Sequence, residues 1–258
     1  MGHPESEGAH YLKGLDNGWE REPKVQVSVR SADDTVKRVI DDAQWPLSGT
    51  RWTRYHLDAS NMALTELPGK AASASYAAIG EGVTFSTGPL AHDIEFAGPI
   101  KAKLWVSSST DDMDLFATLR AFDPLGKEVT FLSAVEPKAP VSQGWLRVSQ
   151  RKLDAKRSTE WQPWHTHDEA QKLKPGEVHE VDLEIWPASL ALPSGHRLAL
   201  TLQGKDFERP GENGVQKGSG WFLHDDPRDR PVEIFSGTQT VYSGGYRVSY
   251  LLLPVISR

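Results

Sequence analysis

The fold is decided by residues 98–130, which read GPIKAKLWVSSSTDDMDLFATLRAFDPLGKEVT. From Ile100 to Val106 every second residue is apolar, which is the period of a strand that buries one face. Small and acidic residues then interrupt the pattern. A second strand follows over residues 115–122, and Asp123-Pro124-Leu125-Gly126 closes it with the composition of a β-turn. The stretch therefore predicts a hairpin-like pair of strands, and it carries no catalytic signature.

The rest of the chain repeats this pattern of short strands and turns that contain glycine or proline. The further segments with strand length or alternation are residues 24–30, 51–57, 145–151, 179–185, 196–203, 232–235, 238–242 and 246–253. Residues 11–18 look like the end of a helix stopped by glycine, residues 68–82 like a loop, and residues 152–175 like a long excursion. About ten short strands without a long helix predict an all-β protein with a jelly-roll β-sandwich fold.

Composition is that of a globular protein and excludes several functions. Hydrophobic residues make up 38% of the 258 residues, enough for one substantial core. The nine tryptophans are expected to pack between the sheets. The net charge of −6 disfavours a nucleic-acid partner, and the longest apolar runs fall short of the roughly 20 residues that span a membrane. The chain has no cysteine and no signal-peptide pattern, so we expect a cytoplasmic protein.

The sequence contains no motif of a serine hydrolase active site. A nucleophilic serine is often presented as Gly-x-Ser-x-Gly, and the nearest approach, Gly218-Ser219-Gly220, has the wrong spacing. Because glycine and serine favour loops, this tripeptide is interpreted as a flexible loop. We therefore predict no catalytic residue and no cofactor.

The densest unusual cluster is Trp161-Gln162-Pro163-Trp164-His165-Thr166-His167-Asp168. Two histidines at i and i+2 share one face of a strand and could ligate a metal, but a third and a fourth ligand at a recognisable spacing are missing. Exposed tryptophans beside polar residues could instead stack on sugar rings. The favoured interpretation is a surface loop held by its two tryptophans. The candidate ligand-binding residues are Trp161, Trp164, His165 and His167, and no metal is predicted.

Two charged clusters complete the candidates. Asp111, Asp112 and Asp114 could serve acid–base chemistry or bind calcium, but the spacing of an EF-hand is absent. Aspartates commonly accept hydrogen bonds from backbone N–H groups at the start of a strand, so a structural turn is favoured. Residues 224–231 (HDDPRDRP) alternate in sign. They indicate a solvated loop of ion pairs, in which either arginine could hold a carboxylate of a neighbouring domain.

Taken together, these segments resemble the C-terminal region of the CocE/NonD family of serine hydrolases, also named the X-Pro dipeptidyl-peptidase C-terminal domain. The matching segments follow the family's order: YLKGLDNGW (11–19), EPKVQVSVR (22–30), WPLSGTRWTRYHLDA (45–59), residues 98–129, GWLRVSQRKLD (144–154), residues 163–200, HDDPRDRPVEIF (224–235) and SYLLLPVI (249–256). The resemblance implies a jelly-roll β-sandwich related to galactose-binding-like modules. In complete members it packs against an α/β-hydrolase domain and helps to wall the substrate cleft.

The resemblance also implies a division of the chain and a partner. Residues 1–23 would be a lead-in with the remnant of the helix that follows the hydrolase domain, and residues 24–258 the jelly-roll domain. The family's catalytic serine, aspartate and histidine lie in the hydrolase domain, so none is carried onto this chain. We expect a fragment or a truncated or split product that is inactive alone. Exposed apolar surface around residues 11–18 could also drive a homodimer.

Two other functions stay open. The alternative is a free-standing carbohydrate-binding module, because the fold suits it and Trp161 and Trp164 could contact a sugar. A hydrolase whose triad carries no motif is the third hypothesis, and the sequence gives it no support.

Overall fold

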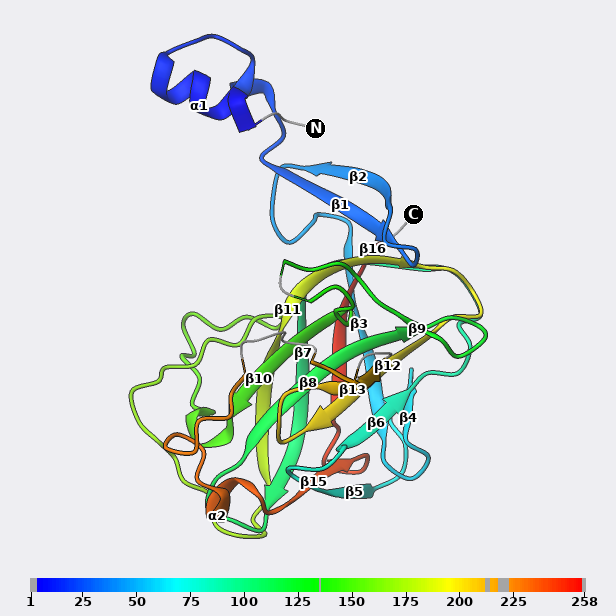
Figure 1. Ribbon diagram of the computed structural model, residues 1–258, viewed down its shortest axis with the longest axis vertical. Coiled ribbons are helices and arrows are strands. Elements are labelled where there is room, and N and C mark those ends of the chain that lie inside the picture. Colours follow the sequence, from blue (N-terminus) through cyan, green and yellow to red (C-terminus); the bar gives the residue numbers. More distant parts are fainter. Residues whose placement is uncertain (1–3, 135, 212–213, 218–222, 257–258) are drawn as a thin grey trace.

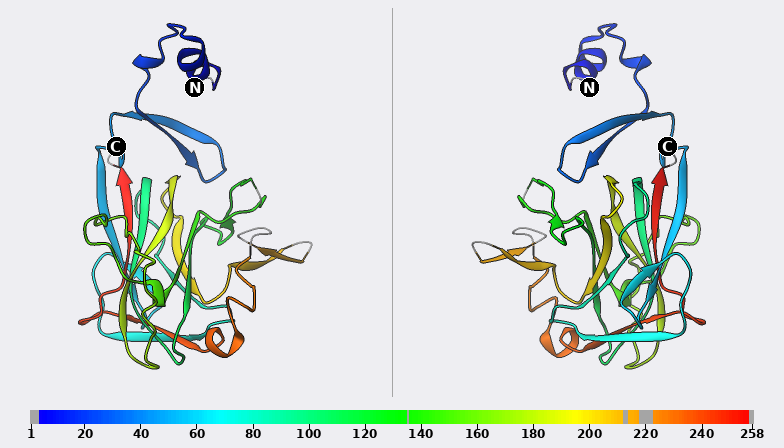
Figure 2. Two further views of the ribbon diagram at one scale, coloured as in Figure 1. Left: turned by 90° about the vertical axis from the view of Figure 1, so that its left-hand side faces the viewer. Right: turned by 90° about the vertical axis from the view of Figure 1, so that its right-hand side faces the viewer.

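The structure is a computed structural model that describes residues 4–134, 136–211, 214–217 and 223–256 (Figure 1). Its strands follow one another in a curled mixed sheet whose two halves face each other across a core. An arm made of a helix and a hairpin stands apart from this body (Figure 2). The predicted all-β class and the β-sandwich are confirmed.

One half of the curled sheet is built around β8 (Asp114–Phe122). This strand pairs antiparallel with β10 (Ser142–Arg147) on one side and with β12 (Arg197–Gln203) on the other. β12 also pairs with β6 (Val83–Ser86), and the short β9 (Glu128–Val129) pairs with the end of β8. β8 is buried along almost its whole length. This burial explains why its sequence is apolar on both faces instead of alternating.

The other half is centred on β7 (Ile94–Ser108), a strand of 15 residues. β7 pairs antiparallel with β11 (His179–Leu192) and with β16 (Tyr250–Ile256), and β16 pairs with β3 (Thr50–Asp58). The apolar residues of the predicted alternation are all buried, whereas Lys103 and Trp105 between them are half-buried; Lys101, predicted to face outward, is buried too and pairs with Asp182. Both β7 and β11 are longer than their patterns predicted, because neighbouring strands extend the ladder past the alternating residues.

β7 and β8 do not form the predicted hairpin. β7 pairs with β11, β16 and β15, whereas β8 pairs with β10, β12 and β9, so the two consecutive strands lie in opposite halves of the sandwich. The buried Asp112 holds the corner between them, because its carboxylate accepts hydrogen bonds from the N–H groups of Met113 and Ser149 at 2.9 and 3.1 Å. The acidic run is therefore a crossing between layers.

The two halves are joined on one side and meet on the other. β4 (Ala63–Thr65) pairs antiparallel with β3 and makes a single parallel pair with β6, which links the halves. On the opposite side β10 crosses β11 so closely that a Cβ on Gly144 would lie 2.0 Å from the carbonyl oxygen of Glu184. Only glycine fits there, because any side chain would enter the neighbouring backbone. The curled sheet thus nearly closes around its core.

The core consists mainly of aliphatic and phenyl side chains. The largest fully buried side chains are Phe85, Phe96, Leu57, Ile100, Leu104, Met113, Leu115, Leu119, Leu183, Ile185, Leu190 and Leu192. No tryptophan of the described residues is among the buried residues, and Trp186 is 63% exposed. The prediction that tryptophans fill the core was therefore wrong. Smaller side chains fill the gap between the halves, and the indoles lie on outer faces, where their N–H groups can reach water.

The arm comprises residues 4–42. It consists of α1 (Pro4–Lys13), the 3-10 turn η1 (Trp19–Arg21), and an antiparallel hairpin of β1 (Val25–Ser31) and β2 (Val36–Asp42). The end of β1 makes a short parallel pairing with β11. Two cations of β2, Lys37 and Arg38, form ion pairs with the buried Glu95 at 2.7 and 2.8 Å. These contacts join the arm to the sandwich.

The helix of the arm ends where the sequence predicted, and it begins earlier. Lys13 is its last residue, and Gly14 follows with a φ of +66°, a conformation that glycine adopts without strain. Residues 4–9, predicted as a polar lead-in, belong to the helix. Its sequence carries standard signals of a helix start, with Pro4 in the first turn followed by acidic residues.

The secondary structure predicted for two segments was wrong. Residues 68–82, predicted as a loop, contain β5 (Ala72–Ala77), which pairs with β15 (Thr238–Ser243). Alanine and serine carry little strand signal, so this strand exists through its partner. Residues 232–235, predicted as a strand, form one helical turn, α2 (Val232–Phe235), immediately after a proline.

The remaining segments complete the fold. The last strand begins at Tyr250 and not at residue 246. Residues 152–175 form the predicted excursion, which follows the 3-10 turn η2 (Val148–Gln150). β13 (Glu208–Gly211) and β14 (Gly214–Lys217) form a separate hairpin. The prediction for Gly218-Ser219-Gly220 falls outside the described residues.

Candidate functional site

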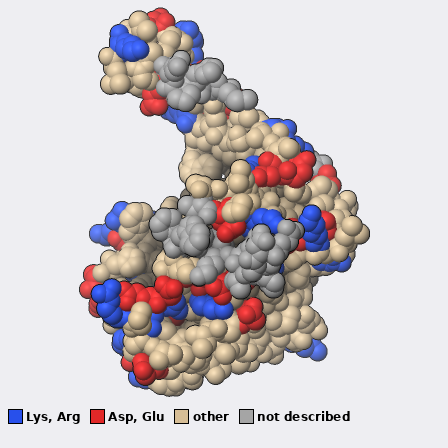
Figure 3. Space-filling view, viewed as in Figure 1, with Lys and Arg blue, Asp and Glu red and all other residues tan. Residues whose placement is uncertain are grey.

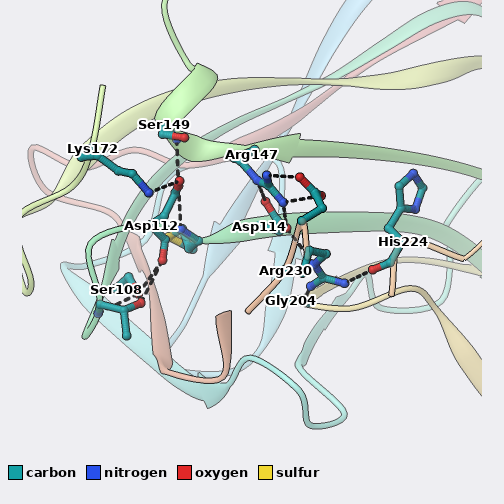
Figure 4. A network of polar contacts seen from close by, with 12 residues as sticks. Ser108, Asp112, Asp114, Arg147, Ser149, Lys172, Gly204, His224 and Arg230 are labelled. Atoms are coloured by element: carbon teal, nitrogen blue, oxygen red, sulfur yellow. Dashed lines mark hydrogen bonds and ion pairs between the residues drawn. The ribbon is translucent and has the colours of Figure 1, made fainter. Parts of the chain in front are cut away.

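Two of the three clusters singled out from the sequence meet at one buried carboxylate. Asp114, at the start of β8, accepts a hydrogen bond from Nε of Arg230 at 2.8 Å (Figure 4). Arg147, the last residue of β10, donates to the same carboxylate through Nε and Nη2 at 2.9 and 3.1 Å. Asp114 is 6% exposed. Two arginines from distant parts of the chain therefore share one buried acid, and we call Asp114, Arg147, Arg230 and Asp229 the Asp114 cluster.

Further bonds engage both arginines of the Asp114 cluster. Nη1 and Nη2 of Arg147 donate to the two carboxylate oxygens of Asp229 at 2.8 and 2.9 Å. The hydrogen bonds to Asp114 and Asp229 raise the pKa of Arg147, and Arg147 in turn lowers the pKa of the Asp229 carboxyl. Arg230 donates to the carbonyl oxygens of His224 and Gly204. Arg230 thus ties three parts of this chain together, a structural role that its charge pattern did not reveal.

The outer part of the charged segment behaves as predicted. Arg228 donates to the carboxylate of Asp226, with Nη2 2.6 Å from Oδ2, and both side chains lie at the surface. Such a solvated pair contributes little to stability.

Within the run 111–114, Asp112 serves the corner between β7 and β8. Asp112 is 2% exposed, and its carboxylate also accepts from Nζ of Lys172 at 3.2 Å. Its carbonyl oxygen accepts from the hydroxyl of Thr110 at 2.8 Å. These are the contacts of a structural turn. Among the described residues no group of three or more His, Cys, Asp or Glu is placed to hold a metal ion.

A hollow of about 270 Å³ opens beside the Asp114 cluster. The ring of His224 lies at its edge, 4.9 Å from the ring of Trp145, which in turn lies 5.4 Å from the ring of Trp186. Asp206 holds this histidine, since its Oδ1 lies 3.0 Å from Nδ1. A histidine–aspartate pair is two thirds of a hydrolase triad. However, in the part of the chain that the structure describes, no serine hydroxyl bonds to the His224 ring.

The candidate tryptophans lie elsewhere, on the outer face of the half that contains β3. The ring of Trp161 stacks on that of Trp52 with centroids 5.1 Å apart and planes 8° apart. The guanidinium of Arg157 lies 3.5 Å from the centroid of the Trp164 ring. Each indole therefore has one face in contact with another side chain. Trp164 remains 39% exposed.

The two candidate histidines do not share the face of a strand, because the excursion is not a strand there. Nε2 of His165 lies 3.1 Å from the carbonyl oxygen of Asp182, and burial lowers the pKa of this histidine. His167 is exposed and has a φ of +52°. Their ring centroids are 6.0 Å apart. That Trp161, Trp164, His165 and His167 bind a ligand stays a prediction.

Sequence reasoning missed Arg147 and Trp186. A signal for the first was present, since Trp145 and Arg147 are two residues apart on a predicted strand and must face the same side. Trp186 carried no such signal, because it lies at an irregularity of the β11 ladder, between Ile185 and Ala188. Its position depends on pairing that the local pattern does not reveal.

The geometry defines a class of protein: a β-sandwich domain with a projecting arm, whose charged clusters serve structure in the described residues. Comparison with known proteins gives the family. The chain belongs to the family of X-Pro dipeptidyl-peptidase C-terminal non-catalytic domains, whose model matches residues 17–252. The resemblance noted from the sequence is confirmed.

Known relatives are much longer than this chain. It is 29% identical to a CocE/NonD family hydrolase from Staphylococcus aureus, whose crystal structure superimposes with a TM-score of 0.83 over 97% of this chain and 45% of that one. It is 21% identical to a cocaine esterase from a Rhodococcus species, over 96% of this chain and 44% of the esterase. An archaeal aminopeptidase, 17% identical with a TM-score of 0.64, shares the fold. The chain thus spans less than half of these relatives. In the described residues no helix is long and apolar enough to cross a membrane.

Proposed function

We propose that this domain packs against an α/β-hydrolase domain, stabilises it and shapes its substrate cleft, without catalysing a reaction itself. The observation that carries the proposal is the family match over residues 17–252, together with relatives named as hydrolases of which the chain covers 44–45%. Ester or peptide hydrolysis would then be the activity of the whole assembly.

The arm supports this proposal, because it exposes apolar side chains that a partner would cover. Leu12 is 86% exposed, Tyr11 68% and Val39 51%. Figure 3 shows the arm standing above the body with a hollow between them. Apolar surface of this kind usually marks an interface. We infer that residues 1–23 belong with the hydrolase side and residues 24–258 form the β-sandwich domain.

Two measurements test the proposal. The purified chain should show no turnover of p-nitrophenyl esters or Xaa-Pro-p-nitroanilides and no labelling by a fluorophosphonate probe. The DNA upstream of the first codon should encode an α/β-hydrolase domain with Gly-x-Ser-x-Gly, and that domain should bind the chain. Turnover that survives repurification would contradict the non-catalytic role.

Substitutions in the arm locate the interface. Leu12→Ser combined with Val39→Ser should weaken the complex with the hydrolase domain in sedimentation velocity. Leu125→Ser is the matched control, because Leu125 is 94% exposed on a turn of the sandwich, outside the arm. An arm-dependent homodimer in place of the complex would assign the same surface to a second copy of the chain.

A free-standing carbohydrate-binding module is the second candidate, and the exposure of Trp164 favours it. Calorimetric titration with a glycan panel tests it, with Trp164→Ala expected to abolish binding and Trp186→Ala, outside the excursion, to preserve it. Absence of binding in the millimolar range would remove this candidate.

We further propose that neither a nucleic acid nor a membrane is the partner and that the protein is cytoplasmic. The net charge of −6 supports the first point, as does the mixing of positive and negative side chains on the face in Figure 3. Cell fractionation with an antibody to the domain tests the location.

A further inference from the structure

A hollow of about 840 Å³ opens where β3 and the end of β16 meet residues 87–94. Its volume lies in the range of small-molecule sites, about 300–1,000 Å³. The hollow is separate from the Asp114 cluster and from the excursion, and none of its lining residues belongs to either. The hollow is therefore a separate candidate site.

The hollow exists because one end of β3 carries polar residues on its inward face. Tyr55 and Leu57 point into the core, so Arg51 and Thr53 lie on the same inward side. In a fully packed sandwich such positions are apolar. Here they share the hollow with residues 87–93, which connect β6 to β7 and are not a strand. The halves therefore remain open at this end.

Tyr55 presents a polar group to the hollow. The residue is 8% exposed, and its hydroxyl makes no hydrogen bond with a described residue. Burial raises the pKa of Tyr55, the negative charge of Glu66 raises it further, and Arg51 opposes this. At neutral pH the phenol is therefore protonated and can donate a hydrogen bond. It lies within the electrostatic influence of one negative charge, Glu66, and one positive charge, Arg51.

Arg51 and Glu66 both line the hollow, and other lining residues form its apolar wall. Extending the β3–β4 register by one residue places Glu66 beside Tyr55. Arg51 lies four residues away along β3, about 13 Å between Cα atoms for a strand rise of about 3.3 Å. Leu64, Leu90 and Val255 line the space.

Arg51 and Glu66 are available to a ligand, whereas other acids at the rim are engaged. Neither Arg51 nor Glu66 has an ion-pair partner among the described residues. By contrast, Asp93 accepts a hydrogen bond from the N–H of Ser194 at 2.9 Å. Glu95 is paired with the cations of β2.

We propose that this hollow binds a small zwitterion whose ammonium and carboxylate groups are separated by an apolar chain. Glu66 would take the ammonium group, and the guanidinium of Arg51 would take the carboxylate, a pairing that arginine makes with two parallel hydrogen bonds. The Tyr55 hydroxyl would donate to the ligand, and the apolar wall would cover its chain. A free ω-amino acid and a lysine at the end of a peptide both carry this chemistry.

Calorimetry and ¹⁵N chemical-shift mapping on the full chain test the proposal. The probes are γ-aminobutyrate, ε-aminocaproate and ω-aminocaprylate, with hexanoate and hexylamine as analogues that carry a single charge. We expect binding that depends on chain length and shift changes confined to residues around the hollow. Each single-charge analogue should bind about tenfold more weakly or worse, the loss of one charge-assisted contact. A peptide that ends in lysine, compared with free ε-aminocaproate, distinguishes the two sources.

Variants assign each end of the ligand. Arg51→Gln should remove the preference for zwitterion over hexylamine, and Glu66→Gln the preference over hexanoate. Tyr55→Phe should weaken all the probes. Arg21→Gln and Glu22→Gln, exposed charges in the arm, are the matched controls and should change nothing. The proposal would be overturned if the zwitterions and the single-charge analogues bound equally well. It would also be overturned if Arg51→Gln and Glu66→Gln left binding unaffected. Because the hydrolase domain is not involved, these results are independent of the function proposed above.

Discussion

Replacing Asp114 with asparagine should be among the most damaging single changes of a polar group in this domain. The Asp114 carboxylate is 8% exposed at its side chain and accepts from Arg230, itself 10% exposed, and from Arg147, 27% exposed. Asparagine removes the charge and turns an N–H₂ group toward a guanidinium. Removing one partner of a buried pair costs about 3–5 kcal/mol. Because Arg147 keeps Asp229 and Arg230 keeps two carbonyl oxygens, we expect the lower end, about 3 kcal/mol.

The assays are urea unfolding and thermal unfolding at neutral pH, both followed by tryptophan fluorescence. A loss of about 3 kcal/mol corresponds to a fall in Tm of about 6–12 °C, at about 2–4 °C per kcal/mol for a domain of this size. The m-value should not change, since the same surface is exposed on unfolding. Asp226→Asn, which breaks the solvated pair with Arg228, is the control and should have no measurable effect. If both variants had equal midpoints, the Asp114 cluster would not hold the two loops together.

Three further predictions concern packing and protonation. Gly144→Ala should destabilise by about 1–3 kcal/mol or more in urea unfolding, because the new Cβ would enter the Glu184 backbone; Gly49→Ala, with open space around its Cα, should be neutral. Leu104→Ala should cost about 2–5 kcal/mol by leaving a cavity in the core, with an unchanged fold by circular dichroism. Burial lowers the pKa of His165 below its ordinary 6.5, so the folded state binds this proton less readily than the unfolded state. Stability should therefore fall as the pH drops from neutral through 6.5 toward the lowered value, and His165→Gln should flatten that slope; an identical pH profile for the variant would contradict the assignment.

Strand existence was predictable from local pattern wherever one face is buried and apolar. In residues 100–106 every second side chain is apolar and buried, and their strand was predicted correctly, although Lys101 between them is buried too. β5 was missed because alanine and serine carry little propensity, and only pairing with β15 makes them a strand. The local pattern could not predict which half of the sandwich each strand joins. No feature of residues 107–113 distinguishes a hairpin turn from a crossing between the halves.

The candidate site was predictable as a set of residues but not as an arrangement. Asp114 and Arg230 each stood out as charged residues in unusual runs, yet 116 positions separate them and no local rule joins them. The excursion was interpreted as a surface loop held by its two tryptophans, but their contacts with Trp52 and Arg157 depend on how the excursion lies on the sheet. Long-range packing decided what each side chain touches.

The position of β16 has a consequence for the order in which the domain can fold. This strand lies between β3 and β7 in the sheet, although both precede it in the chain by many residues. During synthesis, the inner edges of β3 and β7 must therefore wait, unpaired, until β16 has left the ribosome. Pairing across such long separations is slow and exposes strand edges to aggregation. Ribosome-arrested chains that stop before residue 250 should be protease-sensitive, and chains that extend past residue 256 should be resistant.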